Sequence, residues 1–217
     1  MMRIWAIVLA LLAVGAGGFA LVDQQTPPAE RPRLALLSSL PLLFGEEFAL
    51  ETPKLAAIAR IERKYAIVPI PIADAASLDS QSLLLMAHPR AQPAEVLVEL
   101  DAWVSRGGRV VLLADPALKW ESSRPLGDRT RPPPDFADTG LLDHWGLRMS
   151  VGAAHEGALR AVDRRCTVIA DGLIGRCRVG RGSASVIADA DFMMIEGEEA
   201  DRRLDLMMVE LGRADIR

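Results

Sequence analysis

The sequence predicts an α/β fold in which a largely parallel sheet is flanked by helices. Residues 82–116 contain two apolar runs of strand length joined by a segment of helical periodicity, and buried strands linked in this way are parallel. From residue 158 onward, short alternating segments predict antiparallel strands that extend this sheet. A hydrophobic share of 50% in 217 residues supplies one sizeable core, which excludes a wholly disordered chain.

The amino terminus predicts a membrane segment. Residues 4–22 carry no charged side chain and match the roughly 20 residues that cross a bilayer as one helix. We expect an anchor at 1–22, or a cleaved signal peptide, because Gly18-Phe19-Ala20 has small residues where a signal peptidase inspects the chain. Arg3 is the only charged side chain ahead of the apolar run, so the positive-inside rule predicts a single-pass inner-membrane protein whose folded part is periplasmic.

A Pro-rich spacer follows the apolar segment. Residues 23–33 hold three prolines among polar residues, a composition typical of a stiff, extended linker. The folded domain is then expected at 34–217.

The first elements of this domain follow from local patterns. Pro69 and Pro71 each remove a hydrogen-bond donor from their strand, which favours a place at the sheet edge. In order, we expect a strand at 34–37, a helix from Thr52-Pro53 to residue 64, and this edge strand at 66–72.

The central unit is the most regular part of the sequence. Pro93 suits the first position of a helix, and apolar residues recur on one face until Gly107-Gly108 ends it. The flanking strands are expected at 82–87 and 110–114. A long loop at 117–138, rich in proline and arginine, then leaves the carboxyl end of a parallel strand, where functional loops of this fold class lie.

The remaining elements are shorter, apart from a last helix with apolar residues at 204, 207, 208 and 211. Asp171-Gly172 and Gly180-Arg181-Gly182 are good turn sequences between antiparallel strands. Before that helix we expect a helix at 139–145 and strands at 147–151, 158–162, 166–170, 174–179 and 183–188.

The net charge of -4 and the absence of a visible basic face exclude nucleic acid as a general partner. No phosphate-binding loop motif occurs in the sequence, so we do not expect the chain itself to hydrolyse ATP, and no cofactor is expected.

Cys166 and Cys177 are the only cysteines. A two-residue turn at Asp171-Gly172 sets them opposite each other as a hydrogen-bonded pair, and in an oxidising compartment a disulfide is the favoured interpretation. Two buried free thiols are the alternative. A metal site is not expected, because two cysteines without a histidine at ligand spacing leave a tetrahedral shell unfilled.

The candidate binding cleft lies beyond the carboxyl ends of the parallel strands, where open α/β sheets bind ligands. His88-Pro89 occupies the place of an elbow nucleophile, but no Gly-x-Ser-x-Gly motif occurs, and the histidine is interpreted as a structural group rather than a catalytic base. The cleft residues are Ser38, Ser39, His88, Arg90, Asp115 and Lys119. The candidate residues of the covering loop are Arg124, Asp128, Arg129 and Arg131.

An acidic run extends from Asp189 to Asp201. Its spacing does not match a calcium loop, and we interpret the whole run as a solvated approach to the last helix, without a metal.

Three stretches together resemble a known family. They are SSLPLLFGE at 38–46, LDAWVSRGGRVVLLADP at 100–116 and VGRGSASVIADADFM at 179–193. The ensemble is similar to the GldG-like family, auxiliary components of ABC-type transport systems first linked to gliding motility. The resemblance implies a flavodoxin-like sheet of the class I glutamine amidotransferase type. Where true amidotransferases carry an elbow cysteine, this sequence reads Ala87-His88-Pro89, so no catalytic residue is carried over.

Three functions are compatible with these observations. The first is a non-catalytic, membrane-anchored accessory of an ABC-type transport or envelope system, with permease or ATPase subunits as partners and the cleft and its loop as working surface. The second is a divergent hydrolase that uses His88 and Asp115. The third is a purely structural envelope protein.

Overall fold

The computed structural model describes residues 31–46, 54–120, 122–152 and 156–215, and the predicted anchor and most of the predicted linker lie outside this part. Among the described residues, no helix combines the length and the apolar character that a bilayer crossing requires. The described chain begins just ahead of β1, which starts at Arg33.

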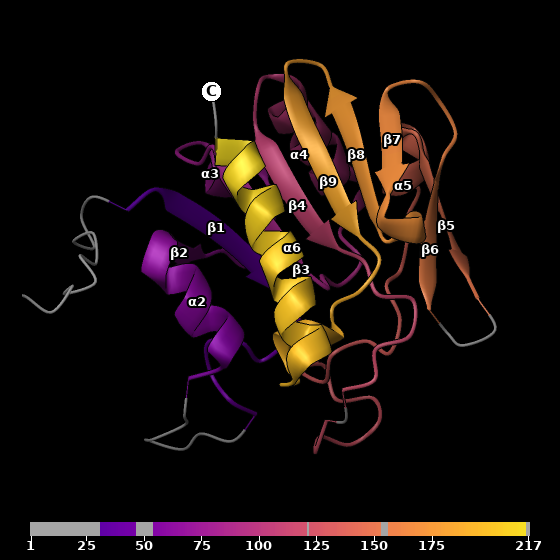
Figure 1. Ribbon diagram of the computed structural model, residues 1–217. Helices are drawn as coiled ribbons and strands as arrows, with labels where there is room; N and C mark the ends of the chain where they lie inside the picture. The colour runs from indigo at the N-terminus through magenta and orange to yellow at the C-terminus, as the bar shows by residue number, and fades with distance from the viewer. Residues whose placement is uncertain (1–30, 47–53, 121, 153–155, 216–217) are drawn as a thin grey trace, which may run out of the picture.

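A seven-stranded sheet forms the centre of the molecule (Figure 1). Its first five strands in spatial order are parallel and the last two are antiparallel. The spatial order is β2 (Ala66–Pro69), β1 (Arg33–Ser38), β3 (Leu83–Ala87), β4 (Arg109–Leu113), β9 (Gly182–Ile187), β8 (Ile174–Val179) and β7 (Cys166–Ile169).

The predicted central unit is confirmed. β3 and β4 are parallel, and all five residues of β3 are buried, as a strand covered on both faces requires. The helix between them begins directly after Pro93. The proline-containing strand β2 lies at one edge of the sheet, as predicted, but it ends at Pro69, so Pro71 of the predicted strand lies outside it.

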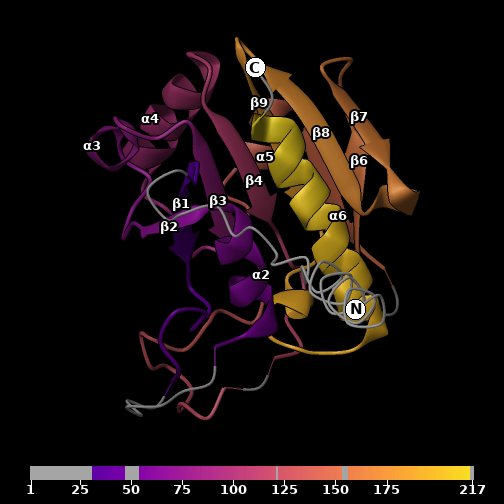
Figure 2. The ribbon, with the colours of Figure 1, turned by 60° about the vertical axis from the view of Figure 1, so that its left-hand side comes forward.

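Helices cover both faces of the sheet (Figures 1 and 2). Residues of β3 alternate between the two cores, so that Leu84 and Met86 face one layer while Leu83 and Leu85 face the other. The first layer contains α3 (Ala75–Leu78), α4 (Ala94–Ser105) and α5 (Leu141–Trp145), and the second contains α2 (Ala56–Lys64) and α6 (Glu198–Asp215).

The C-terminal strands differ from the prediction in two respects. β9 pairs in parallel with β4, so the parallel part of the sheet is longer by one strand than the sequence suggested. β6 (Gly157–Ala161) pairs with β5 (Leu147–Val151) in a separate two-stranded sheet instead of extending the main one. This hairpin packs on the sheet face: the side chain of Leu147 occupies the space that Gly175 of β8 leaves open.

Some element ends also differ. The described helix α2 starts at Ala56 after Leu55, and the predicted start at Thr52-Pro53 lies outside the described residues. Helix α5 starts at Leu141, because Gly140 adopts a left-handed conformation (φ 93°). The short helix α3 was not predicted, and its N-terminal turn is capped by the Asp74 carboxylate, which accepts from the Ser77 N–H.

Cys166 and Cys177 are joined by a disulfide in the predicted register. Their Cα atoms are 4.1 Å apart, the spacing of a non-hydrogen-bonded pair and not of the hydrogen-bonded pair that we predicted. The turn explains the difference, since residues 170–173 form a four-residue connection in which Ala170 and Asp171 both have positive φ.

Candidate functional site

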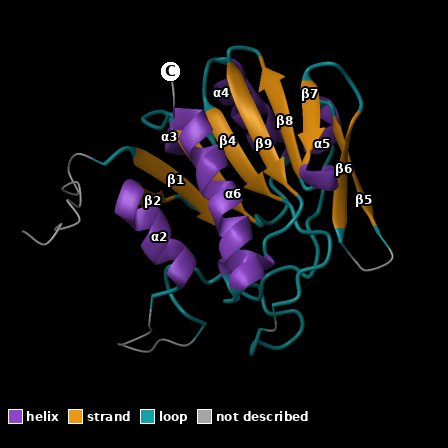
Figure 3. Cartoon of the chain, in the orientation of Figure 1, coloured by secondary structure: helices purple, strands orange, loops and turns teal. Residues whose placement is uncertain are grey.

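The carboxyl ends of β1, β3, β4 and β9 meet at one edge of the sheet, the lower edge in Figure 1. The predicted loop at 117–138 lies at this edge, and Figure 3 shows it as a long run without helix or strand between β4 and α5. The predicted site residues are distributed between this loop and the strand ends beneath it.

His88 follows β3 at the turn where the resemblance places the elbow. Its side chain is fully buried, and its backbone adopts φ 47°, a left-handed conformation that is costly for a residue with a Cβ. Burial lowers the pKa of His88, although the Pro133 hydrogen bond and the carboxylates of Asp115, Asp135 and Asp191 oppose this effect. The imidazole is therefore neutral at pH 7, and its Nε2–H donates to the carbonyl oxygen of Pro133 at 2.9 Å.

The two serines after β1 support this turn. The Ser38 hydroxyl donates to the Ala87 carbonyl at 3.0 Å and accepts from the Leu40 N–H at 2.9 Å. The Ser39 hydroxyl donates to the carbonyl oxygen of His88. Both serines thus hold the backbone of the β3 turn, and neither contacts the imidazole nitrogens that could activate a nucleophile.

Asp115 links the ends of β4 and β9. Its Oδ1 accepts from the Ala117 N–H at 2.9 Å and its Oδ2 from the Ala190 N–H at 2.8 Å, and the side chain is 4% exposed. Asp191 makes a second link, because its Oδ1 accepts from the Lys119 N–H at 2.7 Å. These carboxylates fix the first turn of the covering loop to the segment after β9.

Asp189 completes a group of three carboxylates with Asp115 and Asp191, whose oxygens lie within 4.8 Å of one another. Burial, reinforced by Asp115, raises the pKa of Asp189 to about 6, while Arg203 at 3.7 Å acts in the opposite direction. Burial also raises the pKa of Asp191. Three carboxylates at this spacing offer oxygen ligands of the kind that divalent cations accept, besides their bonds to backbone N–H groups.

The sequence interpretation of the acidic run is therefore wrong for two of its residues. Asp189 and Asp191 belong to the strand-end site because β9 is parallel, whereas Glu196, Glu198 and Asp201 are exposed as expected. The sequence contains a signal for this site, because an Asp-x-Asp pair follows an apolar strand. Only the direction of that strand was predicted wrongly.

A cavity of about 660 Å³ opens beside the three carboxylates. Asp115 and Lys119 of the predicted cleft line it, together with Asp189, Asp191, Arg202 and Arg203. Ser38, Ser39, His88 and Arg90 are not among its lining residues. The structure thus divides the predicted cleft into a mixed-charge cavity and a buried turn that the loop covers.

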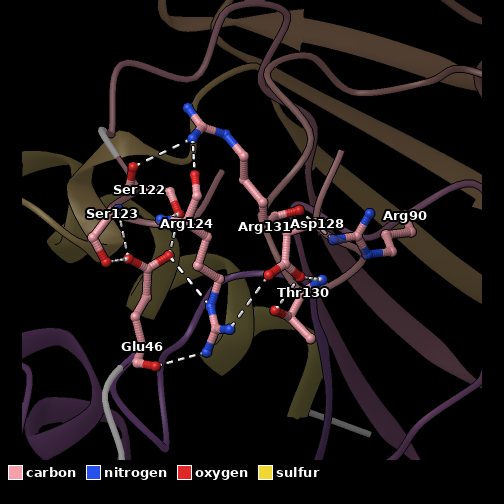
Figure 4. A network of polar contacts seen from close by, with 8 residues as sticks. All are labelled: Glu46, Arg90, Ser122, Ser123, Arg124, Asp128, Thr130 and Arg131. Atoms are coloured by element: carbon pink, nitrogen blue, oxygen red, sulfur yellow. Dashed lines mark hydrogen bonds and ion pairs between the residues drawn. The ribbon is translucent and has the colours of Figure 1, made fainter. Parts of the chain in front are cut away.

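The covering loop is tied to the segment after β1 by Glu46 (Figure 4). The Glu46 carboxylate accepts from the hydroxyl of Ser122 and from both the N–H and the hydroxyl of Ser123, and Arg124 donates to the Glu46 carbonyl at 2.6 Å. Burial alone would raise the pKa of Glu46, but these hydrogen bonds outweigh it and lower the pKa.

The loop is also tied to itself and to the turn after β3 (Figure 4). Arg131 donates to the carbonyls of Ser122 and Arg124, and Arg90 donates to the Arg131 carbonyl. Asp128 accepts from the Thr130 N–H and hydroxyl at 2.7 Å each, which lowers the Asp128 pKa. The predicted loop residues Arg124, Asp128 and Arg131 therefore belong to one network.

Three side chains project from the two tied segments. Leu126 is 88% exposed and Phe44 is 79% exposed. Arg129 is exposed and makes no ion pair or side-chain hydrogen bond with any residue that the structure describes. We call Phe44, Leu126 and Arg129 the loop surface.

Fold and site together define a class of protein: an α/β domain with a mostly parallel sheet, in which a buried histidine occupies the turn after β3. The sequence matches the ABC-type uncharacterized transport system family over residues 31–156, more than half of the chain. The chain belongs to this family of GldG-like auxiliary components of ABC-type transport systems. Among curated proteins, none matches the sequence.

The chain is similar to solved structures at low sequence identity. The mmIFT52 N-terminal domain is 13% identical, with a TM-score of 0.54 over 85% of this chain and 99% of that domain. Two enzymes score lower: the GH42 β-galactosidase Gan42B from G. stearothermophilus (14% identity, 86% and 30% coverage, TM-score 0.48) and the exo-β-1,4-mannosidase Op5Man5 from Opitutaceae bacterium strain TAV5 (13%, 86% and 35%, 0.43). The chain spans about a third of these two enzymes.

Proposed function

We propose that this auxiliary component is a membrane-anchored, periplasmic domain that binds a protein subunit of its ABC-type transport system through the loop surface and has no catalytic activity of its own. The observation that carries the proposal is the hydrogen-bond network of Glu46, Arg90, Ser122 and Arg131, because it holds an exposed surface in one conformation. A preorganised surface loses less conformational entropy on binding.

The composition of the loop surface suits a protein partner. Exposed aromatic and leucine side chains supply apolar area, and arginine is enriched at protein interfaces. Phe44 and Leu126 lie on segments that the Glu46 network joins, and we propose that one partner contacts both of them together with Arg129.

The disulfide supports the periplasmic location. Structural disulfides persist in oxidising compartments and are rare in the cytosol. Together with the apolar stretch at 4–22, the Cys166–Cys177 bond favours an exported domain on a membrane anchor.

The contacts of the candidate nucleophiles support the absence of catalysis. Both cysteines of the sequence are bonded to each other, so neither is available as a nucleophile. The hydroxyls of Ser38 and Ser39 donate to backbone carbonyls, and the Nε2 of His88 is engaged by Pro133.

One observation favours the hydrolase as the second candidate. The Nδ1 of His88 is buried and has no hydrogen-bond partner among the described residues, and the strained φ of this residue is typical of functional turns. In this candidate, Nδ1 would accept a proton once the loop opened, and the Asp115 carboxylate would stabilise the resulting imidazolium.

The test is affinity capture of the full-length protein from native membranes. We expect the wild type to recover the permease or ATPase of an ABC system, and the Leu126→Asp/Arg129→Glu variant to lose it. The matched control is Val98→Asp/Arg160→Glu, which changes an exposed valine and an exposed arginine elsewhere and is expected to keep the partner.

Equal recovery by both double variants would refute the role of the loop surface. The hydrolase would take precedence if the purified full-length protein turned over ester or amide substrates and His88→Ala abolished that activity while the protein stayed folded.

A further inference from the structure

The opposite edge of the sheet carries a second feature, which the sequence analysis did not identify. At the amino ends of the parallel strands, a depression of about 520 Å³ is lined by four arginines and by small residues. The arginines are Arg106, Arg109, Arg181 and Arg213, and the other lining residues are Ser82, Gly107, Gly182 and Ser183. We call these four side chains the arginine cluster.

Separate elements bring the cluster together. Arg109 begins β4 and lies in register between Leu83 of β3 and Ser183 of β9. Arg106 follows α4, Arg181 lies in the turn between β8 and β9, and Arg213 is in the last turn of α6. The turn between β8 and β9 and the C-terminal end of α6 lie at the same, upper edge in Figures 1 and 2.

The guanidinium groups of the cluster have no anionic partner in the part of the chain that the structure describes. None of the four makes an ion pair or a side-chain hydrogen bond with any described residue, and no described acidic residue lines the depression. The Nε of Arg109 is buried without a hydrogen-bond partner among the described residues. By contrast, Arg176 on β8 is bonded to the buried carboxylate of Glu210.

Helix ends explain only half of the cluster. Cations are favourable near the last carbonyls of a helix, which accounts for Arg106 and Arg213. Arg109 and Arg181 belong to a strand and a turn, where no helix end requires a cation. Guanidinium groups gathered without an acidic partner repel one another, and an anionic group in the depression would offset this repulsion.

We propose that the arginine cluster binds a phosphate group. The planar guanidinium fork presents paired N–H donors that match the oxygens of phosphate, and several forks around one depression can contact different oxygens of one group. A Cβ at Gly107 would meet no atom within 4 Å, so this part of the depression is open to a group of this size.

The phosphate has two possible sources, a lipid headgroup or a soluble phosphate. β1 is parallel to β3, so Arg33, its first residue, lies at the edge that carries the cluster. The lipid source rests on the proposed membrane anchor, which would keep this edge near the headgroups of the bilayer. Phosphate binding itself rests on the cluster alone.

The experiment is calorimetric titration of the full-length protein in a neutral detergent at constant ionic strength. One arm uses inorganic phosphate, a second uses dihexanoyl phosphatidylglycerol below its micelle concentration, and chloride is the control anion. We expect saturable binding of phosphate or of the lipid, weakened at least about tenfold in Arg109→Gln/Arg181→Gln, because each lost charge-assisted hydrogen bond costs about one order of magnitude.

The matched control is Arg148→Gln/Arg160→Gln, which removes two exposed arginines of the β5–β6 hairpin and is expected to bind as the wild type does. If the double variant at the cluster unfolds, Arg181→Gln alone carries the test, because this residue is exposed in a turn.

Each outcome has a defined meaning. Binding of the lipid without binding of inorganic phosphate assigns the site to a headgroup, and binding of both with similar affinity assigns it to phosphate in general. Heat that does not saturate with either ligand, or equal affinity in wild type and cluster variant, would overturn the proposal. Neither outcome depends on the loop surface, so failure here is distinguishable from failure of partner capture.

Discussion

The Nε2 of His88 lies 2.9 Å from the carbonyl oxygen of Pro133, across a sequence separation of 45 residues. This hydrogen bond fixes the proline-rich part of the covering loop to the turn after β3. The elbow position, which the resemblance associates with catalysis, here serves as an attachment point for the loop that closes the edge of the sheet.

The first prediction concerns strain at this turn. Replacing His88 with Ala removes a buried side chain and its hydrogen bond, and we expect a loss of about 3 kcal/mol in the free energy of unfolding. Replacing it with Gly removes the same atoms but relieves the left-handed φ of 47°, so His88→Gly should be more stable than His88→Ala by about 1 kcal/mol. Urea unfolding measures both. A lower stability for the Gly variant would show that the turn stores no strain.

The second prediction concerns the pH dependence that Asp189 causes. Its pKa in the folded protein is about 6, above the 3.8 of an unperturbed Asp, so the folded state binds the proton more tightly than the unfolded state. This contribution to stability is fully present below pH 4 and is lost as the pH rises through 6. Asp189→Asn should therefore be more stable than the wild type at pH 7.5, by about 2 kcal/mol.

The measurement is thermal or urea unfolding of both proteins from pH 4 to pH 7.5, in the presence of a chelator. The difference between wild type and variant should grow across this range, and Glu196→Gln, at an exposed position of the same acidic run, is the control that should show no such growth. A constant difference would contradict an elevated pKa at Asp189.

The third prediction concerns the disulfide. Cys166 and Cys177 are 11 residues apart, and closing a loop of this length contributes about 3 kcal/mol by restricting the unfolded chain. The Cys166→Ala/Cys177→Ala variant should lose about this amount. Chemical reduction of the wild type should give a similar loss, measured by guanidinium unfolding with and without reductant. Stability that does not respond to reductant would mean that the bond does not form in solution.

The fourth prediction concerns the loop network. Arg131→Ala removes the donors to the carbonyls of Ser122 and Arg124, so chymotrypsin should cleave after the exposed Leu126 several times faster than in the wild type. Arg129→Ala is the matched control, since this exposed arginine makes no contact in the network. Equal cleavage rates in both variants would show that the network does not order the loop.

Local patterns in the sequence predicted the interior of the fold well. The apolar runs at β3 and β4 and the periodicity of α4 predicted a parallel unit, because burial on both faces leaves a strong signal. The edge position of β2 followed from the missing N–H of Pro69. These properties depend on neighbouring residues in the chain, and a single sequence records them directly.

The direction of the strands and the composition of the site were harder to predict from the sequence. Asp189 and Asp191 were assigned to solvent because the sequence does not say whether β9 pairs with β4 or only with β8. The bond from Ser122 to Glu46 spans 76 residues, and the arginine cluster combines side chains from separate elements in a chain of net charge -4. Such contacts arise from tertiary packing and leave no local pattern.

The position of β1 has a mechanical consequence. This strand is bonded in parallel to β2 on one side and to β3 on the other. A pull on the chain ahead of Arg33, resisted by a partner held at the opposite edge of the sheet, acts along the axis of β1. Both ladders then bear the force in shear, so their hydrogen bonds must break together and not one after another. With the anchor and the partner proposed above, the domain would carry tension between the two without unravelling.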